Sequence, residues 1–205
     1  MNEDITRVLD FWFGEPRLEL AVAAKRWFAK NEDFDREVGE KFLPLMERAQ
    51  RGELDAWASG EDAAKGSLAL VILLDQMSRN VYRGTPGSFA HDKRALAICL
   101  GGIGNGTDRE LPFSERYMFL MPFMHAEDRE LQRRGVEEFD TLGREAEQAG
   151  ASEGLVAMLR SAKEFAEKHA AIIERFGRFP HRNEILGRAS TAEEIEFLAQ
   201  PGSSF

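Results

Sequence analysis

The chain has 205 residues, of which 43% are hydrophobic and 31% charged, so it can build one core and is not intrinsically disordered. Its formal net charge of −9 argues against a general nucleic-acid-binding surface. The single cysteine, Cys99, excludes an intramolecular disulfide and a cysteine zinc cluster.

The N-terminal segment carries Glu3 and Asp4 where a secretory signal needs positive charge. The longest uninterrupted apolar run, Leu68–Leu74, has seven residues, whereas a membrane-spanning helix needs about 20. We therefore expect a cytoplasmic protein with no membrane segment.

Apolar residues recur mostly at helical spacing along the chain. Gly14 and Pro16 should end the first helix, Asp33 should cap the second, and Pro44 should kink or break it. The helices that follow are predicted, in chain order, over residues 62–81, 86–100, 114–121 (ended by Pro122), 127–148, 152–175 and 191–200.

Capping residues and glycines predict the boundaries of three of these helices. Ser59 or Gly60 should open the third helix, and Thr85 with Pro86 should cap and begin the fourth. The glycine-rich run at residues 101–106 should end that fourth helix. Thr191 and Glu194 have the spacing of a capping box for the last helix.

The run Leu68–Leu74 is apolar on every side, which indicates a central buried helix or, at this length, a buried strand. Flanking alanines and the absence of a second predicted strand favour the helix. We therefore predict an all-α fold, an irregular antiparallel helical-hairpin array without a β-sheet, forming one domain over residues 1–205. No clean 34-residue repeat is visible.

Two polar segments are not required by a plain helical bundle, and each contains Arg-Asn followed by glycine: Arg79-Asn80 before Gly84, and Arg182-Asn183 before Gly187. Residues 75–94 and residues 174–191 each hold four basic and two acidic residues, so each carries net +2 in an otherwise acidic chain. If the segments meet, they would form a positive pocket for a carboxylate or phosphate, which arginine binds through two parallel hydrogen bonds.

The segments Asp75–Thr85, Pro122–Asp128 and Phe176–Thr191 resemble the uncharacterised bacterial family known as domain of unknown function 924, and the resemblance extends from Phe11 to Phe197. It implies an all-helical, tetratricopeptide-like fold and no established activity or catalytic residue. Met77-Ser78 departs from the Phe-Pro that the family usually has there.

Each unusual residue also has a purely structural interpretation. Asp75, which follows the most apolar run, would pair with an arginine of the second segment, and the Arg and Asn side chains would brace helix ends and loops. His125 and His181 are candidates for proton transfer, but the histidines and carboxylates match no metal-binding spacing. Cys99 is expected to be a buried apolar residue.

Three functional hypotheses follow. The first is a small-molecule binding protein, or an enzyme of unknown reaction, with an anionic ligand. The second is an adaptor that binds a protein or peptide partner. The third is that the motifs only lock the fold, in which case Arg182→Ala should cost about 3–5 kcal/mol. No cofactor, metal, nucleic acid or membrane partner is implied, and the oligomeric state is open. The predicted ligand-binding residues are Asp75, Arg79, Asn80, Arg83, His125, Arg178, His181, Arg182 and Asn183.

Overall fold

The structure is a computed structural model that describes residues 2–15 and 20–204. Within these ranges the chain is helical, with turns and loops but no β-strand, which confirms the all-α prediction. The α-helices are α1 (Glu3–Phe13), α2 (Leu20–Phe28), α3 (Glu32–Arg51), α4 (Ala63–Val71), α5 (Met77–Val81), α6 (Asp92–Asn105), α7 (Phe113–His125), α8 (Arg129–Gln148), α9 (Glu153–Phe176) and α10 (Ala192–Leu198).

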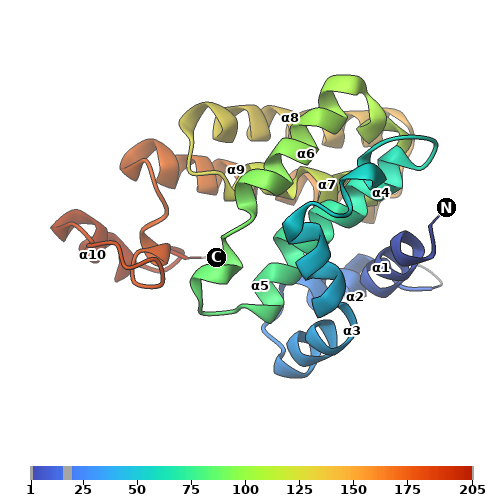
Figure 1. Cartoon of the computed structure of the whole chain (residues 1–205). Helices are drawn as coiled ribbons and strands as arrows, with labels where there is room; N and C mark the ends of the chain where they lie inside the picture. The colour runs from blue at the N-terminus through green and yellow to red at the C-terminus, as the bar shows by residue number, and fades with distance from the viewer. Residues whose placement is uncertain (1, 16–19, 205) are drawn as a thin grey trace.

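The helices form two flanks around a central group (Figure 1). The long helices α8 and α9 pack against each other along one flank, and α1 to α3 form the other. Between them, α4 contacts α1, α6 and α7, while α5 packs on α3. The tetratricopeptide-like arrangement stays a prediction of the family resemblance.

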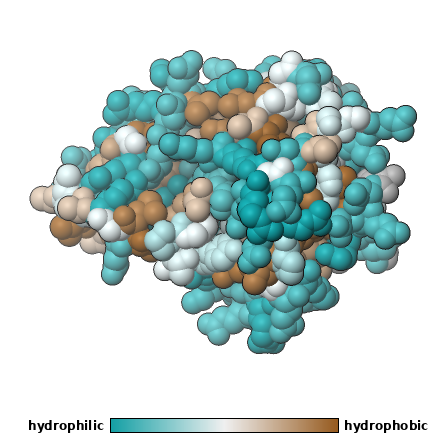
Figure 2. All heavy atoms as spheres, viewed as in Figure 1, coloured by the Kyte–Doolittle hydropathy of each residue, from teal (hydrophilic) through white to brown (hydrophobic). Residues whose placement is uncertain are grey.

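The core centres on α4 and α7. All side chains from Leu68 to Leu74 are fully buried, as expected for a run that is apolar on every side. Hydrophilic side chains cover most of the face in Figure 2, with hydrophobic ones in separate patches between them. No helix in the described part of the chain is both long and apolar enough to cross a membrane.

The helix that contains this run is interrupted by a π-helical turn, Ile72–Gln76, which joins α4 directly to α5. The N–H of Met77 donates to the carbonyl of Ile72, five residues earlier. Such turns occur mostly as isolated bulges and often at functional sites. Here the turn carries Asp75 and Gln76, and both are buried.

The predicted helix end at Pro122 is wrong, because α7 runs through Pro122 to His125. At Pro44, where a kink or break was predicted, α3 continues without a break. Pro44 lies on the exposed side of α3, so water can satisfy the carbonyl that loses its helical N–H donor. The helix α7 is buried over almost its whole length, and this tertiary packing outweighs the local cost of Pro122.

The predicted start of α6 is also wrong, because Pro86–Ser88 forms only a 3-10 turn and the α-helix begins at Asp92. The Thr85 hydroxyl donates to the Tyr82 carbonyl, 2.8 Å away, instead of accepting from a helical N–H. The helix then continues through most of the glycine-rich run and ends at Gly106, whose φ of 81° is left-handed.

The helix starts show the remaining differences. Asn31 caps α3 in place of Asp33, by accepting hydrogen bonds from two backbone N–H groups. The helix α4 begins at Ala63 rather than at Ser59 or Gly60. The capping box of Thr191 and Glu194 is confirmed at α10.

Candidate functional site

A pocket of about 590 Å³ opens between α2, α5, α7, α9 and the segment after α9. One part of its lining is apolar and mostly aromatic, and comprises Trp27, Phe28, Ala29, Phe89, Tyr117, Met121, Met124, Phe165 and Ile185. The other part is polar, and comprises Gln76, Arg79, Asn80, Arg83, Ser88, His125, His169, His181, Arg182 and Ser204.

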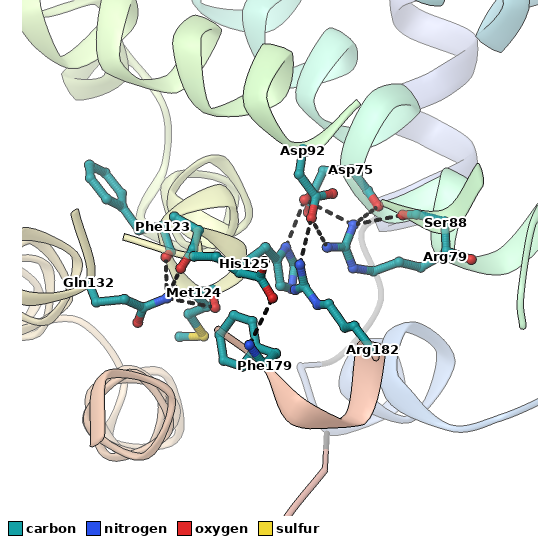
Figure 3. Close-up of polar contacts among 12 residues, drawn as sticks. Asp75, Arg79, Ser88, Asp92, Phe123, Met124, His125, Gln132, Phe179 and Arg182 are labelled. Carbon is teal, nitrogen blue, oxygen red and sulfur yellow. Dashed lines mark hydrogen bonds and ion pairs between the residues drawn. The ribbon is translucent and has the colours of Figure 1, made fainter. Parts of the chain in front are cut away.

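Asp75 lies beneath the polar wall and is fully buried. Its carboxylate accepts from Arg79 Nη1 at 3.1 Å and Gln76 Nε2 at 2.5 Å, and its Oδ1 lies 2.7 Å from His125 Nδ1 (Figure 3). Burial alone would raise the pKa of Asp75, but the charge of Arg79 and the contact with His125 hold it below its usual value. Asp75 is therefore ionised at neutral pH.

Asp92, at the start of α6, joins the two Arg-Asn segments. Its Oδ2 lies 3.0 Å from Arg79 Nη2 and 3.2 Å from Arg182 Nη1, so two arginines 103 residues apart in sequence share one carboxylate oxygen (Figure 3). Burial raises the pKa of Asp92. The predicted partner of Asp75 was an arginine of the second segment; its partner is Arg79, of its own segment, and Arg182 pairs with Asp92 instead.

Arg182 lies against two aromatic rings as well as beside a carboxylate. Its guanidinium carbon lies 4.6 Å from the ring centre of Phe89 and 4.5 Å from that of Phe179, a cation–π arrangement at both distances. The side chain is 7% exposed, and its bond to Asp92 is its one hydrogen bond to the described residues. Burial lowers the pKa of Arg182 to about 10, so the group remains charged.

The three histidines of the pocket are neutral at pH 7. Burial, followed by the charge of Arg79, lowers the pKa of His125 below its ordinary value. Burial also lowers the pKa of His169 to about 3 and that of His181 to about 4. Because Asp75 is ionised, we assign the His125 proton to Nδ1, which then donates to that carboxylate.

Asn80 and Arg83 stand at the edge of the pocket, and both bind Asp35. Asn80 donates to Asp35 Oδ1 at 2.7 Å, and Arg83 donates to both carboxylate oxygens at 2.7 and 2.9 Å. The charge count of the two sequence segments leaves out Asp35, because the fold brings it from α3. Each arginine of the pocket thus has a nearby carboxylate. The net positive charge around the pocket is therefore lower than the +2 counted for each of the two segments.

Arg178 and Asn183 do not line the pocket. Arg178 binds Glu194 through two hydrogen bonds of 2.7 and 2.8 Å, and Asn183 donates to Ser190 and Glu194. These contacts brace the loop before α10 against the segment that precedes it. The structure therefore separates the predicted set: six of its nine residues line the pocket, Asp75 underlies it, and these two lie elsewhere.

Some residues that shape the site were not predicted for it. Gln132 Nε2 lies 2.8 to 3.1 Å from the carbonyls of Phe123, Met124 and Ala126, and so fixes the end of α7 that carries His125 (Figure 3). Trp27 and Phe28 also line the pocket; Trp27 is at the same time part of the hydrophobic core, whereas Phe28 is exposed. Gln132 lies on the same face of α8 as Gly135 and Phe139, and a glutamine on such an apolar face is the sequence signal that would have pointed to this support.

The described residues contain no group of three or more His, Cys, Asp or Glu side chains placed to hold a metal ion. A model of a bacterial protein family of unknown function, DUF924, matches residues 8–202. The chain is also 35% identical to a protein of unknown function from Agrobacterium tumefaciens, whose solved structure gives a TM-score of 0.75 and is matched over 95% of this chain and 96% of that one. No curated protein matches the chain.

Proposed function

The chain belongs to the bacterial family DUF924, whose function is unknown, and we propose that its pocket binds a small organic anion with an aromatic or other apolar body. Arg182 is the observation that carries the proposal. This cation is 7% exposed, lines the pocket and makes one hydrogen bond of 3.2 Å to the described residues. A guanidinium has five N–H donors, and a buried one that is poorly satisfied is costly.

A ligand carboxylate or phosphate would relieve this cost. The Arg182 guanidinium lies over the rings of Phe89 and Phe179, so its N–H groups other than the one bonded to Asp92 are left for binding. Asp92 supplies one carboxylate oxygen for both Arg79 and Arg182. Arg79 also binds Asp75, so an incoming anion would give Arg182 a negative partner that it does not share, through charge-assisted hydrogen bonds, which are the strong ones.

The apolar part of the lining favours a ligand whose uncharged part is a ring or an alkyl chain. Trp27, Tyr117 and Phe165 come from three different helices and line the same pocket, and large apolar side chains with a few placed polar groups are typical of small-molecule sites. Phe28 and Phe165 are 52% and 46% exposed, so apolar surface extends from the pocket to its mouth. A ring or short alkyl chain would bury this surface.

A thermal-shift series tests the proposal. Wild-type protein would be melted with phenylacetate, phenyl phosphate and inorganic phosphate, and with neutral phenylacetamide as the uncharged control. At 100 times its Kd a ligand adds about 2.7 kcal/mol, or roughly 5–10 °C for a chain of this size. We expect the aromatic anions to raise the melting temperature and phenylacetamide to do so much less.

Two variants locate the binding. Arg182→Leu should lose the response to the anions, whereas Arg178→Leu, which changes an arginine outside the pocket, should keep it. Equal shifts in both variants, or no shift with any anion, would contradict the proposal. The adaptor hypothesis, which rests on the tetratricopeptide-like resemblance, would then take its place.

A further inference from the structure

The Asp75–His125 pair gives the pocket a group that can accept a proton. His125 Nδ1 lies 2.7 Å from the Asp75 carboxylate, and the imidazole, which is 12% exposed, lines the pocket. With its proton on Nδ1, the ring presents the Nε2 lone pair. That nitrogen makes no hydrogen bond to any described residue, so the position next to it is left for a ligand or a water molecule.

Within the described ranges no serine hydroxyl or cysteine thiol is hydrogen-bonded to His125, although Ser204 also lines the pocket. Ser88 donates its hydroxyl proton to the Tyr82 carbonyl, and Ser78 donates to the Leu73 carbonyl. Cys99 is buried, and burial raises the pKa of its thiol. The proton that His125 could remove therefore comes from water or from the ligand itself.

We propose that His125 is the general base of an ester hydrolysis in this pocket, acting on water, with Asp75 as its positioning residue. The inference rests on the proposed function, because the same pocket must hold the substrate. The substrate class is carboxylic esters with an apolar body and an anionic group. Arg182 would bind that anionic group, and the products are an alcohol and an organic acid with a new carboxylate.

Every proton and electron pair in the reaction is accounted for with water as the only co-reactant. His125 Nε2 takes a proton from water as the water oxygen attacks the ester carbonyl carbon, and the carbonyl π electrons move to oxygen. The oxyanion electrons then re-form the carbonyl as the carbon–oxygen bond to the alcohol breaks, and the leaving oxygen takes the proton from Nε2. The new acid loses its own proton to water and becomes a carboxylate. The imidazole returns to its neutral state.

The electrostatic surroundings of His125 favour this reaction over removal of a proton from carbon. Burial and the positive charge of Arg79 lower the pKa of His125, while Asp75 and Asp92 act to raise it. The resulting base is weak, which suits assistance to an attacking water better than abstraction from a weakly acidic C–H group. Asp75 also fixes the tautomer, which leaves Nε2 as the basic atom.

Two chromogenic esters of the same chain length test the inference. The mono-4-nitrophenyl ester of glutaric acid carries a carboxylate, and 4-nitrophenyl valerate is its neutral counterpart. We expect release of 4-nitrophenol above the buffer rate, with kcat/KM higher for the anionic ester. His125→Gln should reduce kcat/KM about 100-fold or more, whereas His91→Gln, the same change at the histidine outside the pocket, should leave it unchanged.

Asp75→Asn separates a positioning role from a structural one. The variant loses the carboxylate that raises the pKa of His125, so the low-pH limb of kcat/KM should move to lower pH as kcat falls at least about 10-fold. A kcat loss without movement of this limb would contradict the positioning role. If the variant does not fold, the wild-type rate should still be higher in H2O than in D2O, and equal rates would contradict proton transfer to His125.

The two proposals fail separately. If phenylacetate raises the melting temperature but neither ester is hydrolysed, the pocket binds organic anions and the catalytic inference is wrong. Hydrolysis that survives His125→Gln also overturns the inference. If neither phenylacetate nor phenyl phosphate shifts the melting temperature, the proposed binding function itself is wrong.

Discussion

Arg116 and Arg182 are buried to nearly the same degree, with side chains 6% and 7% exposed, but their surroundings differ. Arg116, on α7, has two carboxylates: Asp108 Oδ2 lies 2.8 Å from its Nε, and Glu145 Oε2 lies 2.5 Å from its Nη1. Arg182 has a share of one carboxylate, and it lines the pocket, which Arg116 does not. Burial alone therefore does not separate the two arginines, whereas the supply of carboxylates does.

The largest expected effect is at Arg116. Arg116→Leu leaves Asp108, which is 2% exposed, without its cation, and breaking a buried pair costs about 3–5 kcal/mol. Urea denaturation should show this loss in the free energy of unfolding. Arg109→Leu is the matched control, because Arg109 is 68% exposed and reaches Glu145 only at 3.7 Å; its change should stay within about 0.5 kcal/mol. Equal losses of unfolding free energy in the two variants would contradict a structural role for the buried Arg116 pair.

The second effect depends on pH and comes from the pocket. The pKa of His169 is about 3 in the folded protein and about 6.5 in an unfolded chain. Between these values the unfolded chain binds a proton that the folded protein does not, so stability falls as the pH drops through this range. His169 alone should cost about 2 kcal/mol between pH 7 and pH 5.

Melting curves at pH 5, 6 and 7 measure this dependence. The melting temperature of His169→Gln should depend less on pH than that of the wild type. His91→Gln should reduce this dependence by a smaller amount, since His91 is only half-buried. A wild-type melting temperature that rises on acidification would show that the histidines of the pocket wall are not held neutral.

The smallest effect should come from Arg182 itself. Arg182→Leu leaves Asp92 with Arg79, places an apolar side chain between Phe89 and Phe179, and removes a cation with few partners. We expect a loss of about 1 kcal/mol in the free energy of unfolding, which is typical of a single substitution. A loss as large as that of Arg116→Leu would mean that the Arg-Asn segments serve to lock the fold.

The sequence allowed the fold class and the approximate helices to be predicted, because apolar periodicity and caps are local signals. The capping box of Thr191 and Glu194 is one such signal, and it is confirmed. The continuity of α3 through Pro44 could not be predicted in this way, because it depends on which side of the helix faces water.

The candidate site was only partly predictable for a related reason. The compositions of the two Arg-Asn segments pointed to Arg79 and Arg182, which the fold brings to one carboxylate oxygen. The contact of Asp92 with Arg182 and the contact of Asp35 with Arg83 each join residues that are far apart in the sequence. A pattern read within one segment contains no information about them.

The π-helical turn at Ile72–Gln76 makes the helical phase of this segment part of the site. Each residue of an α-helix rotates the chain by about 100°, so one residue removed from this turn would convert it to regular α-helix and rotate all of α5 relative to α4. Asp75 and Arg79 would then no longer both keep their present positions relative to the buried run Leu68–Leu74. The site therefore tolerates a change of side chain here better than a change in the number of residues.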